Sequence, residues 1–75
     1  MEIKKQIASM FIAWRYAKAQ TQMKVAKVLG VTFQQVQKYE SAVNGISSEK
    51  LLLFCNYYNI NLNSFQEGDH YQILD

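Results

Sequence analysis

The chain has 75 residues, of which 49% are hydrophobic, and this is enough for one small domain with a modest core. A single cysteine, Cys55, excludes an internal disulfide framework and a multi-cysteine zinc site, and no apolar run approaches the roughly 18 residues that cross a bilayer. The first residues also lack the pattern of a signal peptide. We therefore expect a cytoplasmic protein with no metal ion, no cofactor and no membrane contact.

The net charge of +2 is unevenly distributed. Residues 1–50 hold all eight Lys and Arg against three acidic residues, a net charge of +5, whereas residues 51–75 hold three acidic residues and no Lys or Arg. The first part of the chain is therefore the part suited to a polyanion, although a solvated basic face with no partner gives the same pattern.

A first helix is predicted from about Lys4 to Lys18. Apolar residues recur there every three or four positions, so they share one helical face that packs on a core. These residues are Ile3, Ile7, Met10, Phe11 and Trp14.

Two short helices are predicted next. Thr21 is a suitable N-cap for the first, which ends at Gly30, a natural left-handed stop, and Thr32 is a suitable N-cap for the second, which begins near Phe33. Val25, Ala26 and Leu29 form the inner face of the first, and Val36, Tyr39 and Glu40 share one face of the second. The opposite face of the second helix is polar and carries Gln34, Gln35 and Lys38.

A fourth helix is predicted after Ser47 and Ser48, followed by a short helical turn around Leu62 and Phe65, before Gly68. The apolar side of the fourth helix contains Leu51, Leu52, Phe54, Cys55 and Tyr58. Residues 69–75 have little pattern and fit an ordered tail, a short helix or a frayed end equally well. The chain is thus predicted to be all-α, a compact bundle of about five short helices over residues 1–68 with a C-terminal tail over 69–75.

Residues 21–41 predict a helix-turn-helix, because two short helices meet at a glycine and the second exposes a polar face. The segments 21–26, 29–32 and 36–40 also resemble the XRE, or lambda-repressor-like (Cro/CI-type), family of helix-turn-helix transcriptional regulators. The resemblance extends from about Arg15 to Phe65. It implies a lambda-repressor-like bundle of five helices that binds double-stranded DNA.

The resemblance implies that the third helix reads base edges in the major groove. Glutamine can pair with adenine N6 and N7, and lysine can pair with guanine O6 and N7. Phe33 either touches a thymine methyl group or packs on the neighbouring helix. The expected base contacts are Phe33, Gln34, Gln35 and Lys38.

The resemblance also implies contacts with the DNA backbone, first of all from Gln22 at the start of the second helix. Gln37 is placed to reach either a base or a phosphate. The loop 41–46 is almost uncharged, so its donors are Ser41, Asn44 and the loop amides, and the salt dependence of binding should be shallow. The remaining expected backbone contacts are Lys24, Lys27 and Thr32.

Relatives of this family often pair an arginine on the first helix with a glutamate at the end of the third, which implies an ion pair between Arg15 and Glu40. If the pair is partly buried, loss of one partner should cost about 3 to 5 kcal/mol, whereas a surface pair contributes about 0 to 1 kcal/mol. The role expected for both residues is structural.

The expected working unit is a homodimer, because two copies related by a two-fold axis read a near-palindromic site. The resemblance places the dimer contact around the fourth and fifth helices, while the apolar tail residues fit equally well as a cover for the core of one subunit. The candidates are Leu53, Tyr57, Asn61, Tyr71, Ile73 and Leu74.

The leading hypothesis is a sequence-specific transcriptional regulator, a repressor that occupies its operator and excludes polymerase. One alternative is an antitoxin-like regulator that also binds a toxin protein, and another is a protein-interaction module that has lost DNA binding. An enzyme is not expected, because His70 lies in the tail and Cys55 lies on an apolar helix face, so no nucleophile and base are placed together.

Overall fold

The computed structural model describes residues 2–65, which form four α-helices and no β-strand. The helices are α1 (Ile3–Ala17), α2 (Gln22–Leu29), α3 (Phe33–Glu40) and α4 (Ser48–Tyr58). The predicted all-α class is confirmed, but this part of the chain holds four helices where about five were expected. A turn at residues 62–63 leads into helical backbone at Ser64 and Phe65, and the rest of the expected fifth helix and the tail lie outside the described residues.

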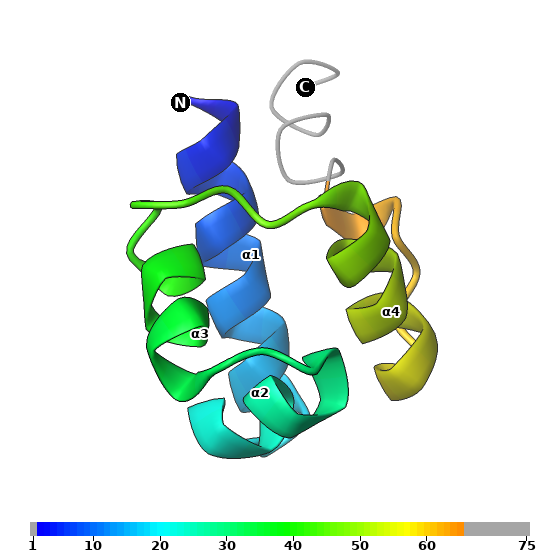
Figure 1. The fold of residues 1–75 in the computed structure, drawn as a ribbon. Helices are drawn as coiled ribbons and strands as arrows, with labels where there is room; N and C mark the ends of the chain where they lie inside the picture. The colour runs from blue at the N-terminus through cyan, green and yellow to red at the C-terminus, as the bar shows by residue number, and fades with distance from the viewer. Residues whose placement is uncertain (1, 66–75) are drawn as a thin grey trace.

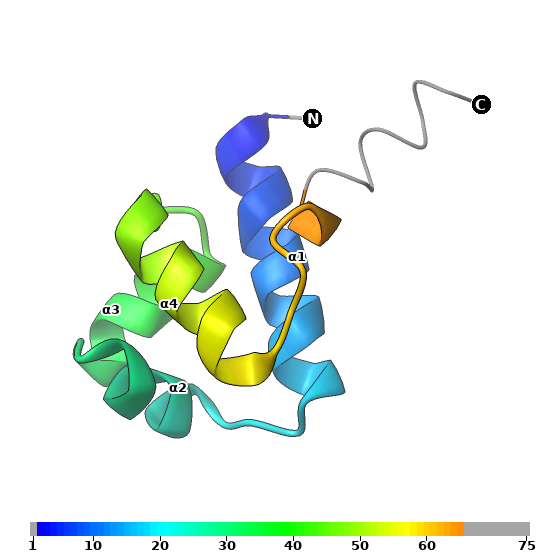
Figure 2. The ribbon, with the colours of Figure 1, turned by 90° about the vertical axis from the view of Figure 1, so that its right-hand side faces the viewer.

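The longest helix, α1, is flanked by α3 on one side and α4 on the other, and α2 lies across one end of the group (Figure 1). In this arrangement α2 packs against both α3 and α4, and α1 packs against α3. Figure 2 shows the same four helices from the side of α4. Within residues 2–65 no helix has the length and apolar character that a membrane span requires.

Three hydroxyl side chains cap the helices that the sequence predicted them to cap. The hydroxyl oxygens of Thr21, Thr32 and Ser47 each accept a hydrogen bond from the backbone N–H three residues later, at 3.1, 3.0 and 3.1 Å. Such a cap satisfies an N–H group that has no partner inside its helix, and its loss costs about 1 kcal/mol. The caps therefore fix where α2, α3 and α4 begin.

The turn between α2 and α3 depends on Gly30, which has φ 68° and ψ 34°. In this left-handed conformation the backbone N–H of Gly30 donates to the carbonyl of Lys27, and that of Val31 donates to the carbonyl of Ala26. Residues with a β-carbon adopt this conformation at a cost, so glycine is favoured here. The predicted stop is therefore also the point where the chain reverses into α3.

The core lies where the four helices meet. Phe11 of α1, Phe54 of α4 and Val36 of α3 are at most 1% exposed, and Val25 and Leu29 of α2 are fully buried with them. The rings of Phe11 and Phe54 have their centroids 4.4 Å apart. Because these side chains come from all four helices, their packing fixes the angle between α2 and α3.

Two apolar residues that were expected to face the core are exposed instead. Ile3 is 64% exposed because it is the first residue of α1, and Leu52 is 45% exposed because it points away from the buried side that Phe54 and Cys55 define. The boundaries of α1 also differ slightly from the prediction, since the helix begins and ends one residue earlier than expected.

A lysine contact that the sequence did not indicate connects α4 to the end of α2. The Nζ of Lys50 donates a hydrogen bond to the carbonyl oxygen of Leu29 at 2.8 Å. Leu29 is the last residue of α2, where carbonyl groups lack partners within the helix and the helix dipole favours a cation. The contact therefore stabilises the turn that precedes α3.

Candidate nucleic-acid interface

The outer face of α3 carries the residues that the sequence assigned to DNA bases. Val36 and Tyr39 are buried against the core, so the side chains of Gln34, Gln37 and Lys38 are turned to solvent. Gln35 is only half-exposed, because it lies beside the buried face. The predicted base-contact residues therefore lie on one helix, with Gln35 at the margin of its exposed face.

Phe33 lies at the first position of α3 and is 37% exposed. It belongs neither to the buried core nor to the partly buried apolar residues packed against it. An aromatic ring placed at the N-terminal end of an exposed polar helix is available for contact with an apolar group of another molecule. The exposure of Phe33 favours a contact with another molecule over packing on the neighbouring helix α2.

The residues assigned to the DNA backbone lie on α2, at the start of α3, at Gln37 within α3 and in the loop that follows it. Lys24 and Lys27 are exposed on α2, and the Thr32 hydroxyl accepts a hydrogen bond from the Gln35 N–H while its own hydrogen remains to be donated. Ser41 differs, because its hydroxyl donates to the carbonyl of Lys38 at 3.3 Å.

The backbone amides of residues 41–44 are already engaged within the protein, contrary to the expectation that they donate to a phosphate. The backbone N–H groups of residues 41–44 all donate to carbonyl groups of α3, and those of Val43 and Asn44 both donate to the carbonyl of Lys38. The left-handed conformation of Ala42, with φ 62°, folds the loop back on the helix end. Residues 41–44 therefore offer side chains only.

Asn44 also lies on the rim of an apolar groove of about 310 Å³ between α1 and this loop. Apart from Asn44 and Lys4, the groove is lined by apolar or aromatic residues and by Gly45. Asn44 therefore borders this groove and the end of α3 at once, since its N–H also donates to Lys38.

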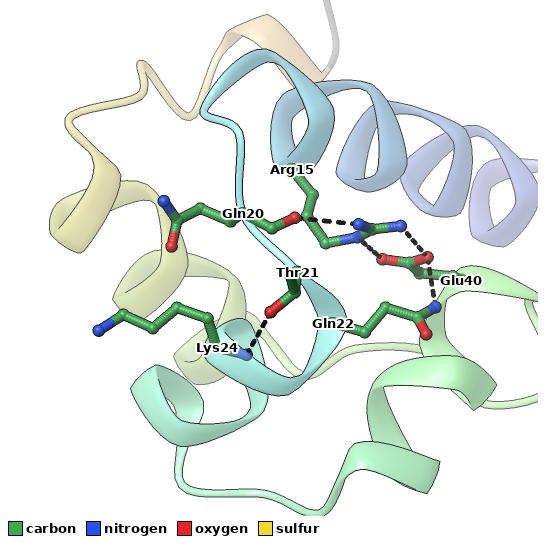
Figure 3. A network of polar contacts seen from close by, with 6 residues as sticks. All are labelled: Arg15, Gln20, Thr21, Gln22, Lys24 and Glu40. Atoms are coloured by element: carbon green, nitrogen blue, oxygen red, sulfur yellow. Dashed lines mark hydrogen bonds and ion pairs between the residues drawn. The ribbon is translucent and has the colours of Figure 1, made fainter.

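Arg15 and Glu40 form a close ion pair between α1 and the last residue of α3 (Figure 3). The Arg15 Nε donates to Oε2 of Glu40 at 2.5 Å and its Nη2 donates to Oε1 at 3.0 Å, so the contact is bidentate. The two side chains are only 9% and 8% exposed, which excludes the surface alternative. The hydrogen bond to Glu40 raises the pKa of Arg15, so the guanidinium keeps its charge.

The ion pair is part of a larger network that the sequence did not indicate. The Nη1 of Arg15 donates to the carbonyl of Gln20 at 3.0 Å, and the Gln20 side-chain oxygen accepts from the hydroxyl of Tyr58 at 3.1 Å. The Nε2 of Gln22 donates to Oε1 of Glu40 at 2.9 Å (Figure 3). The network thus joins all four helices, and Gln22 is bound within it.

Three of the predicted dimer-contact residues can be placed. Leu53 and Tyr57 are 41% and 57% exposed and lie one helical turn apart on α4, and Asn61 is exposed in the segment after the helix. They therefore form part of an outer surface that includes the end of α4. The other three, Tyr71, Ile73 and Leu74, lie outside the described residues.

Cys55 is 2% exposed and lies in the core, where burial raises the pKa of its thiol. Among residues 2–65 no three His, Cys, Asp or Glu side chains come together as metal ligands would. His70 lies outside the described residues.

Two short helices joined by a left-handed glycine turn, the second with an exposed polar face, define a helix-turn-helix domain. A family model described as helix-turn-helix matches residues 21–65, which is more than half of the chain. The chain belongs to this family, of the XRE type, which confirms the resemblance noted from the sequence.

Two relatives each align with the chain over 54 residues. An uncharacterized HTH-type transcriptional regulator of Rickettsia conorii is 43% identical over 54 residues, which is 72% of this chain and 43% of that protein. Another of the same description, from Rickettsia prowazekii, is also 43% identical over 54 residues, 72% of this chain and 42% of that protein. The chain therefore spans less than half of the length of these relatives, and no solved structure matches it significantly.

Proposed function

We propose that the chain is a sequence-specific transcriptional regulator, a repressor, that inserts α3 into the major groove of double-stranded DNA. The observation that carries the proposal is the outer face of α3, where Gln34, Gln37 and Lys38 are exposed on a helix whose orientation the core fixes. The helix-turn-helix family and the regulator names of the two relatives support it.

Base recognition is assigned to the residues that α3 presents first. The Gln34 amide is proposed to pair with N6 and N7 of adenine in the major groove. Lys38, one helical turn further along α3, is proposed to donate to O6 and N7 of guanine. Gln35 reaches bases from the margin of the face, and Phe33 meets a thymine methyl group. Each good base contact contributes about 1 to 3 kcal/mol of discrimination.

Phosphate contacts fix the position of α3 without choosing the sequence. The start of α2 contributes Gln22, whose amide nitrogen has a second hydrogen beyond the one donated to Glu40. Thr32 donates through its hydroxyl at the start of α3. The other proposed backbone contacts are Lys24, Lys27, Gln37 and Asn44. Ser41 joins them only if its hydroxyl turns from the carbonyl of Lys38 to the phosphate.

We propose that the repressor acts as a homodimer on a near-palindromic site with half-sites about 34 Å apart. The exposed Leu53 and Tyr57 and the neighbouring Asn61 support a contact through the end of α4. The tail residues Tyr71, Ile73 and Leu74 are proposed to join that contact. Occupation of the operator then blocks polymerase directly.

A second candidate function is binding of a protein, with or without DNA binding, as in an antitoxin-like regulator. One observation favours it: Leu52, Leu53 and Tyr57 are 45%, 41% and 57% exposed on a single helix. Adjacent exposed apolar side chains of this size often mark a contact with another protein. The almost uncharged loop after α3 is in keeping with weak DNA binding.

The test is selection from a randomised DNA pool at two salt concentrations, with the wild type, Gln34→Ala, Gln35→Ala and a control, Ser9→Ala, on the exposed side of α1. Enrichment of a palindrome, weakened by Gln34→Ala but not by Ser9→Ala, is the expected result. Salt-dependent binding without enrichment contradicts sequence-specific reading, and no binding favours the protein-binding candidate.

A further inference from the structure

The carboxylate of Glu40 binds the side chains of two residues from two other helices. Oε2 accepts from Nε of Arg15 at 2.5 Å, while Oε1 accepts both from Nη2 of Arg15 at 3.0 Å and from Nε2 of Gln22 at 2.9 Å. Glu40 is the last residue of α3 and Gln22 is the first of α2, so the bond joins the two helices of the helix-turn-helix directly. Figure 3 shows the side chains of Arg15 and Gln22 converging on the Glu40 carboxylate.

A carboxylate has only acceptors, so this contact also determines which way the Gln22 amide is turned. Its nitrogen faces Glu40, and its oxygen cannot take that place without opposing another acceptor. The carboxylate itself is held by the bidentate contact with Arg15, and Arg15 is held in turn by the carbonyl of Gln20 at 3.0 Å. The side chain of Gln22 is therefore fixed at the start of α2, with one amide hydrogen left to donate.

We propose that Glu40 is a positioning residue for DNA binding: it holds the Gln22 amide in the orientation that donates to a backbone phosphate. The proposal rests on the function proposed above. It gives the ion pair a second role, since Arg15 neutralises a carboxylate that would otherwise repel the phosphate that Gln22 approaches.

The negative charge of Glu40 and its positioning of Gln22 should change DNA affinity in opposite directions. Replacement by a neutral residue removes a negative charge near the DNA and leaves Arg15 unpaired, so electrostatics alone would strengthen binding. The positioning role predicts that the same replacement weakens DNA binding. Glu40→Gln puts an NH₂ group, which can only donate, in place of one of the two oxygens that accept from Arg15 and Gln22. Whichever oxygen it replaces, the bidentate contact with Arg15 is lost and the Gln22 amide is held less firmly, so binding should weaken.

The experiment is a double-mutant cycle of Glu40→Gln and Gln22→Met on the full chain. Methionine at position 22 keeps the length of the side chain but removes the donor. Dissociation constants for one selected duplex are measured below the unfolding temperature of every variant, and circular dichroism melts record folding separately. We expect about 10-fold weaker binding for each single variant and less than about two-fold further loss when Glu40→Gln is added to Gln22→Met.

Equal losses from Glu40→Gln in both backgrounds would mean that Glu40 acts only through the fold, and would overturn the proposal. So would Gln22→Met binding as tightly as the wild type, a result that leaves the DNA-binding function intact. A wild type that binds no duplex overturns the proposed function and this inference together. If Glu40→Gln does not fold, the two Gln22 side-chain NH₂ signals of the wild type decide: the hydrogen donated to Glu40 should keep its signal on addition of DNA while the other shifts, and a shift of neither, or loss of the Glu40 contact, overturns the proposal.

Discussion

The ammonium group of Lys50 in α4 lies 2.8 Å from the carbonyl oxygen of Leu29, the residue that ends α2. Lys50→Met keeps most of the aliphatic stem and removes the charged donor. We expect it to lower the free energy of unfolding by about 1 to 2 kcal/mol, because a half-buried carbonyl at a helix end loses its partner. Urea unfolding measures the change, and Lys5→Met, at an exposed position of α1, should change stability much less.

Arg15→Met should destabilise the domain more strongly than any surface substitution. The carboxylate of Glu40, only 8% exposed, would then be buried without its cation, which costs about 3 to 5 kcal/mol. The double variant Arg15→Met with Glu40→Met should recover much of this loss, because no uncompensated charge remains. If thermal unfolding shows the single and double variants to be equally destabilised, the burial of an unpaired charge is not the cause.

Gly30→Ala separates backbone strain from steric clash at the turn. A β-carbon at Gly30 meets no atom within 4 Å, so the whole cost should come from the left-handed φ of 68°. We expect a loss of about 1 to 2 kcal/mol in the free energy of unfolding and little change in DNA affinity once the protein is folded. Unfolding and binding measured on the same preparation test this, and a large loss of affinity without loss of stability would contradict it.

The stability of the domain should fall at alkaline pH. Burial raises the pKa of the Cys55 thiol, so the unfolded chain loses this proton near the ordinary value of 9.0 while the folded chain retains it. Stability from this group is thus complete below pH 9.0 and decreases as pH rises above it; Tyr58, whose pKa burial also raises, adds to the fall from about pH 10.0. Melting temperatures measured across this range should decline less steeply in Cys55→Ala.

The thiol offers an independent check, because a core cysteine reacts only when the domain opens. Alkylation of Cys55 should be slow in the native protein and fast in denaturant.

Local signals made most of the fold predictable. The caps at Thr21, Thr32 and Ser47 and the stop at Gly30 depend on residues within one turn of each other, and periodicity was enough to find the inner faces of α2 and α3. The exposure of Ile3 and Leu52 was not predictable in this way. It depends on where the neighbouring elements end in space, which the spacing within one helix does not contain.

The candidate nucleic-acid interface was predictable to about the same extent as the fold. The pattern on α3 and the family resemblance identified its polar face, and the resemblance identified the partners of the ion pair. The bonds from Gln22 to Glu40 and from Lys50 to Leu29 connect residues 18 and 21 positions apart, and glutamine and lysine are ordinary surface residues in a sequence. Only the relative placement of the helices makes them partners.

Because the core is shared among four helices, α3 keeps its orientation only in the complete domain. The apolar side chains that orient α3 meet Phe11 from α1 and Phe54 from α4, both of which lie outside the helix-turn-helix segment. A peptide of residues 21–41 would leave Val25, Leu29 and Val36 in water and could not keep its two helices at a fixed angle. The surface proposed to read DNA is therefore a property of the cooperative folded state, present in full or not at all.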